Sequence, residues 1–140
     1  MQPLLSVEEV QALVRGAFPN TSSGSTIFVE AVEAGMARIR MPFGNWMLRP
    51  GKVLSGPALM AAADTAMYAV VLAHVGPQLM AVTADMELRF LNKGMPGDPI
   101  AEARILKLGR RLVVMECRIW SAAKPEVVVM HSTGSYMLPA

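Results

Sequence analysis

Asp64 is the residue whose position in the chain most clearly suggests chemistry. It is the only charged residue between Lys52 and Glu87, and it lies midway along an apolar run with the character of a helix. Taking a carboxylate out of water costs on the order of several kcal/mol, so a buried carboxylate has either a partner or a purpose. Two roles are open: an ion pair with an arginine, such as Arg49 or Arg89, or catalysis or direct contact with a ligand.

The composition is that of a folded protein with a sizeable core. Of the 140 residues, 53% are hydrophobic and 17% are charged, which excludes a disordered chain and favours one domain over residues 1–140. This apolar content is high for a small monomer, so we expect some surface to be buried between subunits. The net charge of +2, with no run of Lys or Arg, argues against nucleic acid as a partner.

The cysteine and the histidines offer neither a disulfide framework nor a metal site. Cys117 is the only cysteine, which fits a reducing, cytoplasmic compartment, and the N-terminus lacks the pattern of a signal peptide. His74 and His131 are too dispersed for metal-ligand spacing. We expect His74 to be structural, at a helix end where a cation is favoured, and His131 has no obvious acidic neighbour. No metal or cofactor is therefore expected.

The apolar run over residues 57–75 is nearly long enough to cross a bilayer, which takes roughly 20 residues. It is rich in alanine, however, and Asp64 near its centre carries an insertion penalty of roughly 2.5–3.5 kcal/mol. We therefore expect no membrane span but a buried helix in a soluble fold. This helix begins at Gly56-Pro57, with Ser55 or Gly56 as its cap, and ends at Gly76-Pro77.

Other regular elements lie on both sides of this helix. Ser6 and Glu9 predict a capping box for a short helix that ends near Gly16, so residues 1–24 form an N-terminal helix and loop. Alternating side chains predict two strands around a glycine turn, over about residues 26–32 and 37–41, and then a loop over residues 42–51.

The second half of the chain alternates again. Four strands are expected over residues 82–91, 100–108, 112–120 and 127–137. A long apolar helix followed by a strand meander predicts an α+β fold in which an antiparallel sheet wraps around a long central helix. Small alanine side chains on the helix would let the sheet approach it closely.

The central helix and its neighbours resemble the hotdog-fold acyl-CoA thioesterases, particularly the PaaI-like branch of the phenylacetate pathway. That family carries a His-Gly-Gly sequence, then a helix with an Asp nine residues after the His, usually followed by Thr-Ala. The same spacing gives Ser55-Gly56-Pro57 and Asp64-Thr65-Ala66 here. The strand over residues 83–91, Gly97-Asp98 and the Gly109-Arg110 turn also match, so the resemblance covers roughly residues 25–138.

The resemblance implies a homodimer or a dimer of dimers that hydrolyses acyl-CoA thioesters. By the family pattern, the Gly56 N–H at the helix N-terminus would stabilise a developing oxyanion. Asp64 would act as general base or as nucleophile, and the residues leave both roles open. Helix rise places Asp64 about 12 Å along the axis from Gly56. What the resemblance implies is that the two groups meet from opposite subunits, with their helices antiparallel.

The chain departs from the family pattern around Gly56. Ser55 stands at the position of the family His, and Pro57 at that of the second Gly. Arg49 stands where an Asn is common, and Asn45 lies nearby but out of register. Ser55 either donates a hydrogen bond to the substrate or serves only as the helix N-cap. Arg49 and Asn45 stay candidate substrate contacts.

Four further residues are candidate substrate contacts. Thr65 and Tyr68 follow Asp64 on the helix, and Tyr68 shares its face, so Tyr68 either lines an acyl pocket or packs in the core. Arg110 and Arg111, at a glycine turn, either contact the phosphates of coenzyme A or are solvated. Coenzyme A would be part of the substrate and not a cofactor.

These patterns together favour a thioesterase. The apolar, methionine-rich surroundings of the helix favour a medium-chain or aromatic acyl group. The alternative is a non-catalytic hotdog protein that binds an acyl-CoA or a similar ligand. A hydratase of the same fold is a third possibility, but it would pair the acidic helix residue with a histidine, and Ser55 stands in that place.

Overall fold

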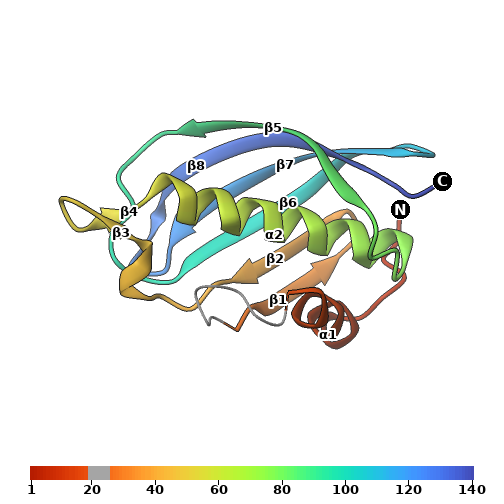
Figure 1. Ribbon diagram of the computed structural model, residues 1–140, viewed down its shortest axis with the longest axis horizontal. Helices are drawn as coiled ribbons and strands as arrows, with labels where there is room; N and C mark the ends of the chain where they lie inside the picture. The colour runs from red at the N-terminus through yellow and green to blue at the C-terminus, as the bar shows by residue number, and fades with distance from the viewer. Residues whose placement is uncertain (19–25) are drawn as a thin grey trace.

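The computed structural model describes residues 1–18 and 26–140. Six strands form one antiparallel sheet in the order β1-β2-β6-β7-β8-β5, and this sheet curves around a long helix, α2 (Figure 1). The expected α+β hotdog fold is confirmed. The helices are α1 (Val7–Ala17) and α2 (Gly56–Val75). The strands of the sheet are β1 (Phe28–Glu33), β2 (Met36–Arg40), β5 (Val82–Phe90), β6 (Pro99–Leu108), β7 (Leu112–Ser121) and β8 (Lys124–Met137).

The two ends of α2 are set by local sequence. Ser55 Oγ accepts a hydrogen bond from the Ala58 N–H at 3.3 Å, so Ser55 is the N-cap. Pro57 is tolerated in the first turn because its missing N–H would have had no partner inside the helix. At the other end, Gly76 adopts a φ of 89° and its N–H donates to the Leu72 carbonyl at 3.0 Å. The predicted limits of the helix are therefore confirmed.

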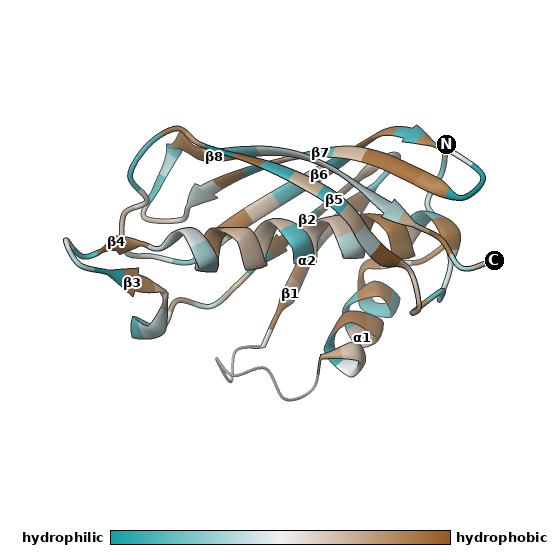
Figure 2. Ribbon diagram, turned by 45° about the horizontal axis from the view of Figure 1, so that its top comes forward, coloured by the Kyte–Doolittle hydropathy of each residue, from teal (hydrophilic) through white to brown (hydrophobic). Residues whose placement is uncertain are grey.

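Most of α2 is buried under the sheet, and Figure 2 shows apolar colouring along much of the helix and of the strands that cover it. Among the described residues, α2 is the one helix long and apolar enough to cross a membrane, and 72% of its most apolar window is buried inside the molecule. Its apolar character is therefore that of a core helix. The alanines that let the sheet approach are Ala58, Ala62, Ala63, Ala66, Ala69 and Ala73.

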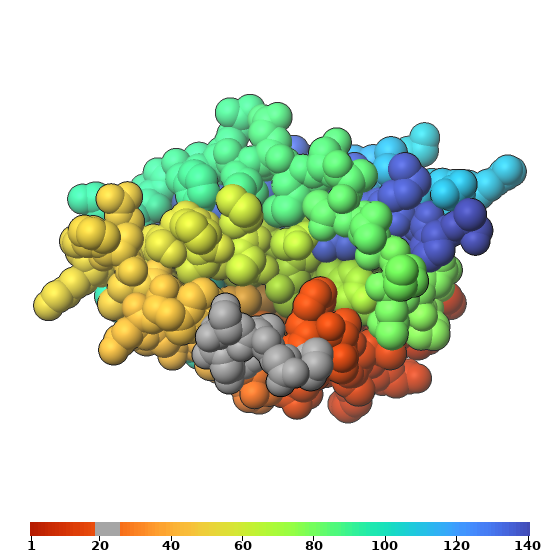
Figure 3. All heavy atoms as spheres, in the orientation of Figure 1, coloured from red at the N-terminus to blue at the C-terminus, as the bar shows by residue number. Residues whose placement is uncertain are grey.

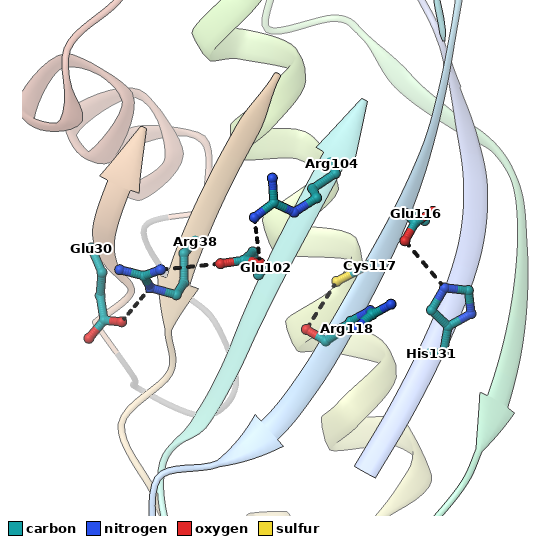
Figure 4. Close-up of polar contacts among 8 residues, drawn as sticks. All are labelled: Glu30, Arg38, Glu102, Arg104, Glu116, Cys117, Arg118 and His131. Carbon is teal, nitrogen blue, oxygen red and sulfur yellow. Dashed lines mark hydrogen bonds and ion pairs between the residues drawn. The ribbon is translucent and has the colours of Figure 1, made fainter. Parts of the chain in front are cut away.

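The outer face of the sheet carries charged side chains in pairs (Figure 4). Arg38 on β2 pairs with Glu30 at 3.3 Å and with Glu102 at 3.2 Å. His131 Nε2 lies 3.7 Å from Glu116 on the neighbouring strand. The expectation that His131 lacks an acidic neighbour is therefore wrong, because that neighbour is reached only through the pairing of β7 with β8.

His74 ties the end of α2 to the β1–β2 turn. The Gly35 N–H donates to His74 Nε2 at 2.8 Å, and Nδ1 lies 2.8 Å from the Val70 carbonyl oxygen. Because Nε2 is an acceptor, the proton sits on Nδ1 and the buried ring is neutral. The predicted structural role is confirmed. Its physical basis is two hydrogen bonds, however, and not a cation at a helix end.

The N-terminal segment packs on the same end of α2. The capping box of Ser6 and Glu9 is present, with bonds of 3.0 and 3.1 Å. The Leu4 N–H donates to the Ala73 carbonyl at 2.7 Å, and α1 packs against α2 and β1. The loop expected over residues 19–24 lies outside the described residues.

The segment predicted as an irregular loop over residues 42–51 contains short regular structure. A 3-10 turn at Asn45–Met47 leads into β3 (Leu48–Arg49), which pairs with β4 (Val53–Leu54). The connection is tight because Gly51 and Lys52 both take positive φ, at 96° and 56°. The many turn-forming residues thus mark a small hairpin, which leads into the N-terminus of α2.

Candidate active site

Asp64 opens onto a pocket of about 420 Å³ between α2, the end of α1 and one end of strands β5 and β8. The residue is half-buried, so its carboxylate keeps access to the pocket. The pocket is lined by Ala17, Phe18, Asp64, Tyr68, Leu79, Ala81, Val82, Thr83 and Tyr136.

Two hydroxyl groups hold one oxygen of the Asp64 carboxylate. Tyr136 Oη donates to Asp64 Oδ1 at 2.6 Å, and Thr83 Oγ1 donates to the same oxygen at 2.8 Å. Within the described residues, Oδ2 accepts no hydrogen bond and the carboxylate forms no ion pair. The alternative of an arginine partner is therefore wrong for this part of the chain, and Arg89 pairs with Glu87 instead.

Strand pairing brings the two hydroxyls together. Thr83 on β5 and Tyr136 on β8 are direct partners in the antiparallel ladder, and a bulge follows Thr83. Burial, and then the hydrogen bond to Asp64, raise the pKa of the Tyr136 hydroxyl. Tyr136 is therefore a neutral hydrogen-bond donor at neutral pH.

Aromatic rings form one wall of the Asp64 pocket. The Tyr68 ring stacks on the Tyr136 ring with centroids 6.1 Å apart, and Phe18 meets Tyr68 edge-on at 5.7 Å. The Tyr68 hydroxyl donates to the Leu79 carbonyl at 3.0 Å. Tyr68 is thus a buried core residue that also lines the Asp64 pocket.

Gly56 opens onto a second pocket, of about 710 Å³, at the N-terminus of α2. Among the described residues, its N–H donates no hydrogen bond, as expected for the first residue of a helix. A Cβ built on Gly56 would lie 3.5 Å from the Phe90 ring, an ordinary contact, so the fold itself does not demand glycine there. The pocket is lined by Arg49, Val53, Leu54, Gly56, Leu59, Phe90, Leu91, Asn92, Lys93 and Gly94.

Of the three candidate residues near Gly56, only Arg49 lines the Gly56 pocket, whereas Asn45 and Ser55 do not. Arg49 lines the Gly56 pocket, together with Lys93. Asn45 is exposed in the 3-10 turn and lines neither pocket. Ser55 uses its oxygen to cap α2, which is the role that the N-cap interpretation gave it.

The remaining candidates lie outside both pockets. The Thr65 hydroxyl is used within the helix, where it donates to the Ala61 carbonyl at 2.8 Å. Arg110 and Arg111 sit at the β6–β7 turn, and Arg111 Nε donates to the Leu138 carbonyl at 3.4 Å. Within one chain, the pocket at Gly56 takes its positive charge from Arg49 and Lys93.

Sequence reasoning missed Thr83, Tyr136, Phe18 and Phe90 as site residues. Both hydroxyl residues lie on strands that alternate as ordinary sheet strands do. Finding them requires the register of β5 against β8, which pairs them beside the helix. The one available signal was that Thr83 belongs to the strand that resembles the thioesterase pattern.

One surface joins the two pockets. The exposed stripe of α2, which consists of Pro57, Met60, Ala61, Asp64 and Thr65, is the part of the helix that the sheet leaves uncovered. Figure 3 shows atoms of α2 reaching the surface beneath β5. Strand β5 is one of the two edge strands of the sheet. It pairs only with β8 among the described strands and carries the exposed apolar residues Val82 and Phe90.

An antiparallel sheet around a central helix, with a helix N-terminus and a mid-helix carboxylate on one open face, defines a hotdog protein of the thioesterase type. The comparisons agree. The profile of the thioesterase superfamily matches residues 51–128. A Saccharolobus solfataricus protein, provisionally named an esterase, is 34% identical over 115 residues, which are 81% of this chain and 74% of that protein.

Solved structures give the same assignment. A protein of Silicibacter sp. TM1040, provisionally named a thioesterase, is 33% identical, with a TM-score of 0.88 over 100% of this chain and 96% of its own. The E. coli PaaI protein from the phenylacetic acid degradation operon has the same fold, with a TM-score of 0.77, 20% identity and 97% of each chain covered. The chain belongs to the thioesterase superfamily, and this membership supports hydrolase activity on thioesters.

Proposed function

We propose that this protein is an acyl-CoA thioesterase in which Asp64 is the catalytic carboxylate. The observation that carries the proposal is the position of Asp64 at a pocket and the pattern of hydrogen bonds to its carboxylate. It lines a pocket, its Oδ1 accepts two hydrogen bonds, and its Oδ2 accepts none from the described residues. A carboxylate with one free oxygen beside a pocket can activate water or attack a carbonyl carbon. The cytoplasm, where acyl-CoA thioesters are abundant, is the proposed location.

The active unit is a dimer in which each site takes Gly56 from one copy and Asp64 from the other. The two residues line separate pockets of one chain, and both lie on the exposed side of α2. The outer edge of β5, which pairs with no other described strand, is available for strand pairing with a second copy. A two-fold axis that pairs position 56 with position 64 passes close to position 60, so Met60 lies beside it. A dimer of dimers would keep the same site.

Asp64 of one copy and Gly56 of the other can together hydrolyse a thioester. Water attacks the thioester carbonyl carbon while Asp64 Oδ2 takes its proton, and the Gly56 N–H of the other copy stabilises the oxyanion. The intermediate collapses with cleavage of the C–S bond, and the thiolate recovers the proton. The products are the carboxylic acid and free coenzyme A. In the alternative course, Oδ2 attacks the carbon directly, the thiolate leaves, and water cleaves the resulting anhydride.

The substrate class is a medium-chain or aromatic acyl-CoA. The rings of Phe18, Tyr68 and Tyr136 supply an apolar surface at the Asp64 pocket that suits a flat or flexible hydrocarbon group. Arg49 and Lys93 at the Gly56 pocket supply positive charge for the phosphates of coenzyme A.

The first test is release of free thiol from a panel of acyl-CoAs of different chain length and aromatic character. Asp64→Asn keeps the size of the side chain, and we expect it to lower kcat at least about 100-fold. Asp85→Asn is the matched control, because Asp85 is a β5 carboxylate that bonds Ser135 outside both pockets. Full hydrolysis by Asp64→Asn would contradict the assignment of Asp64.

A second test asks whether each site spans two copies. Gly56→Val adds a branched side chain at a position that lines the pocket, where the Cβ itself makes only an ordinary contact with Phe90, another pocket residue. Asp64→Asn and Gly56→Val should each be inactive alone. When the two chains are co-expressed, half of the dimers are mixed and each has one intact site, so activity returns to about a quarter of the unmodified level. If co-expression restored no activity, Gly56 and Asp64 of each site would have to come from the same chain.

A second function is favoured by one observation. Ser55 stands in place of the family His and its oxygen is used as a helix cap, which leaves fewer groups to orient a substrate. In that case the protein binds acyl-CoA without cleaving it. Saturable binding of every acyl-CoA in the panel, with no release of thiol, would select this alternative.

A further inference from the structure

We propose that Tyr136 is a positioning residue for Asp64: its hydroxyl, with that of Thr83, fixes Oδ1 and leaves Oδ2 as the oxygen that reacts. The inference rests on the proposed thioesterase function. It starts from the contact of Tyr136 Oη with Asp64 Oδ1 at 2.6 Å, the shorter of the two bonds to that oxygen. The same hydroxyl lies 3.1 Å from the Asp64 carbonyl oxygen, so it joins the carboxylate to its own helix backbone.

The Asp64 carboxylate needs these two hydrogen bonds to stay in one orientation, because rotation about its χ2 torsion is easy. The two oxygens of an aspartate exchange by rotation about a broad sp³–sp² torsion. Two donors aimed at one oxygen remove that symmetry. Tyr136 is itself held rigidly, since it is 3% exposed, its ring stacks on Tyr68, and its backbone pairs with Thr83.

Tyr136 supplies a hydrogen bond and not a proton. Burial and the nearby Asp64 carboxylate both raise the pKa of its hydroxyl, so it does not ionise during turnover. A donor of this kind stabilises the charged form of the carboxylate that it contacts. Tyr136 should therefore act on Asp64 by holding the orientation of its carboxylate.

The first experiment compares kcat and KM for Tyr136→Phe, which keeps the stacked ring and removes only the hydroxyl. We expect kcat to fall about 10- to 100-fold, with KM changed less than about threefold. A loss in kcat without a matching change in KM distinguishes a lost orientation of Asp64 from a general disturbance of the pocket.

Ser135→Ala is the matched control. Ser135 is the next residue on β8, and its hydroxyl also donates to a β5 carboxylate, Asp85 Oδ1, at 2.8 Å, but it lines neither pocket. We expect this variant to keep the unmodified kcat and KM. An equal loss of kcat in both variants, or a rise in KM for Tyr136→Phe as large as the fall in kcat, would overturn the inference.

The second experiment needs no catalysis. The chain has two tyrosines, so ¹³C at Cζ of tyrosine gives two NMR signals, which the Phe variants assign. We expect the Tyr136 signal to move in Asp64→Asn, because an amide is a weaker acceptor than a carboxylate, while Tyr68 serves as an internal reference. A Tyr136 signal that is the same in Asp64→Asn as in the unmodified protein would disprove the contact. Absence of thiol release by the unmodified protein would instead contradict the proposed function.

Discussion

Thr83 and Tyr136 are direct cross-strand partners, and their hydroxyls donate to the same oxygen of Asp64. The site therefore lies at the junction between helix and sheet: α2 supplies the carboxylate, and β5 and β8 supply the groups that orient it. This geometry holds only if the helix and the two strands keep their relative positions, so the orientation of Asp64 depends on the packing of the whole core.

The proposed dimer predicts a strong effect at Met60. In one chain Met60 is 44% exposed, so Met60→Glu should fold. In the dimer, two glutamates would face each other near the symmetry axis, where like charges repel. We expect light scattering to show a shift to monomer, and activity to fall although Asp64 and Gly56 are unchanged. Leu106→Glu is the control, since Leu106 is 57% exposed on β6, away from α2. A dimeric, fully active Met60→Glu would contradict this arrangement.

The positive charge at the Gly56 pocket predicts selective effects on KM. Removing the charge in Arg49→Ala or Lys93→Ala should raise KM for acyl-CoA about three- to tenfold at low salt, because each loses an attraction to phosphate. Acyl-pantetheine, which has no phosphate, should be hydrolysed with unchanged KM. Lys124→Ala, at the exposed first residue of β8, is the control. Larger effects from Arg110→Ala or Arg111→Ala would place the phosphates at the β6–β7 turn instead.

Cys117 predicts how stability depends on pH above neutrality. Burial raises the pKa of this thiol, and the nearby Glu102 carboxylate adds to the shift. The folded state therefore keeps the proton that the unfolded chain loses above about pH 8.5. Stability from the thiol is complete below that pH, and it falls by about 1.4 kcal/mol per pH unit above it.

Urea unfolding at pH 8 and at pH 10 tests this. In the unmodified protein the free energy of unfolding should decrease between the two pH values, and in Cys117→Ala the decrease should be smaller by roughly 2 kcal/mol. Other alkaline groups act on both proteins and cancel in the comparison. Equal slopes would show that the thiol ionises freely in the folded state.

Most of the fold could be predicted because local rules govern it. The capping box at Ser6, the N-cap at Ser55 and the glycine after α2 are signals within a few residues, and each is confirmed. The small hairpin β3–β4 was missed because Lys52 takes a positive φ that its residue type does not announce. Local patterns thus identify the elements better than they identify turns of unusual backbone geometry.

The candidate site was harder to predict, since its contacts are long-range. Asp64 stood out because its charge contrasts with an apolar helix. Its partners are 19 and 72 residues away in the chain, and no spacing rule connects them. The arginine partner, one of the two roles left open for Asp64, rested on charge alone, whereas in the structure two neutral hydroxyls donate to the carboxylate. The positions of Arg49 and Lys93 likewise became clear only when the β3–β4 hairpin and the segment after β5 were placed beside Gly56.

Phe18 lines the Asp64 pocket at a position that tolerates substitution. Tyr68 and Tyr136 are core residues, so their size is constrained by close packing around α2. Phe18 is 55% exposed at the C-cap of α1, and substitutions there cost little folding free energy. The dimensions of the pocket can therefore diverge between related proteins through a residue of the N-terminal helix, while the carboxylate and its two donors stay as they are. Under the proposed function, acyl preference and catalytic competence would then be separable traits of one chain.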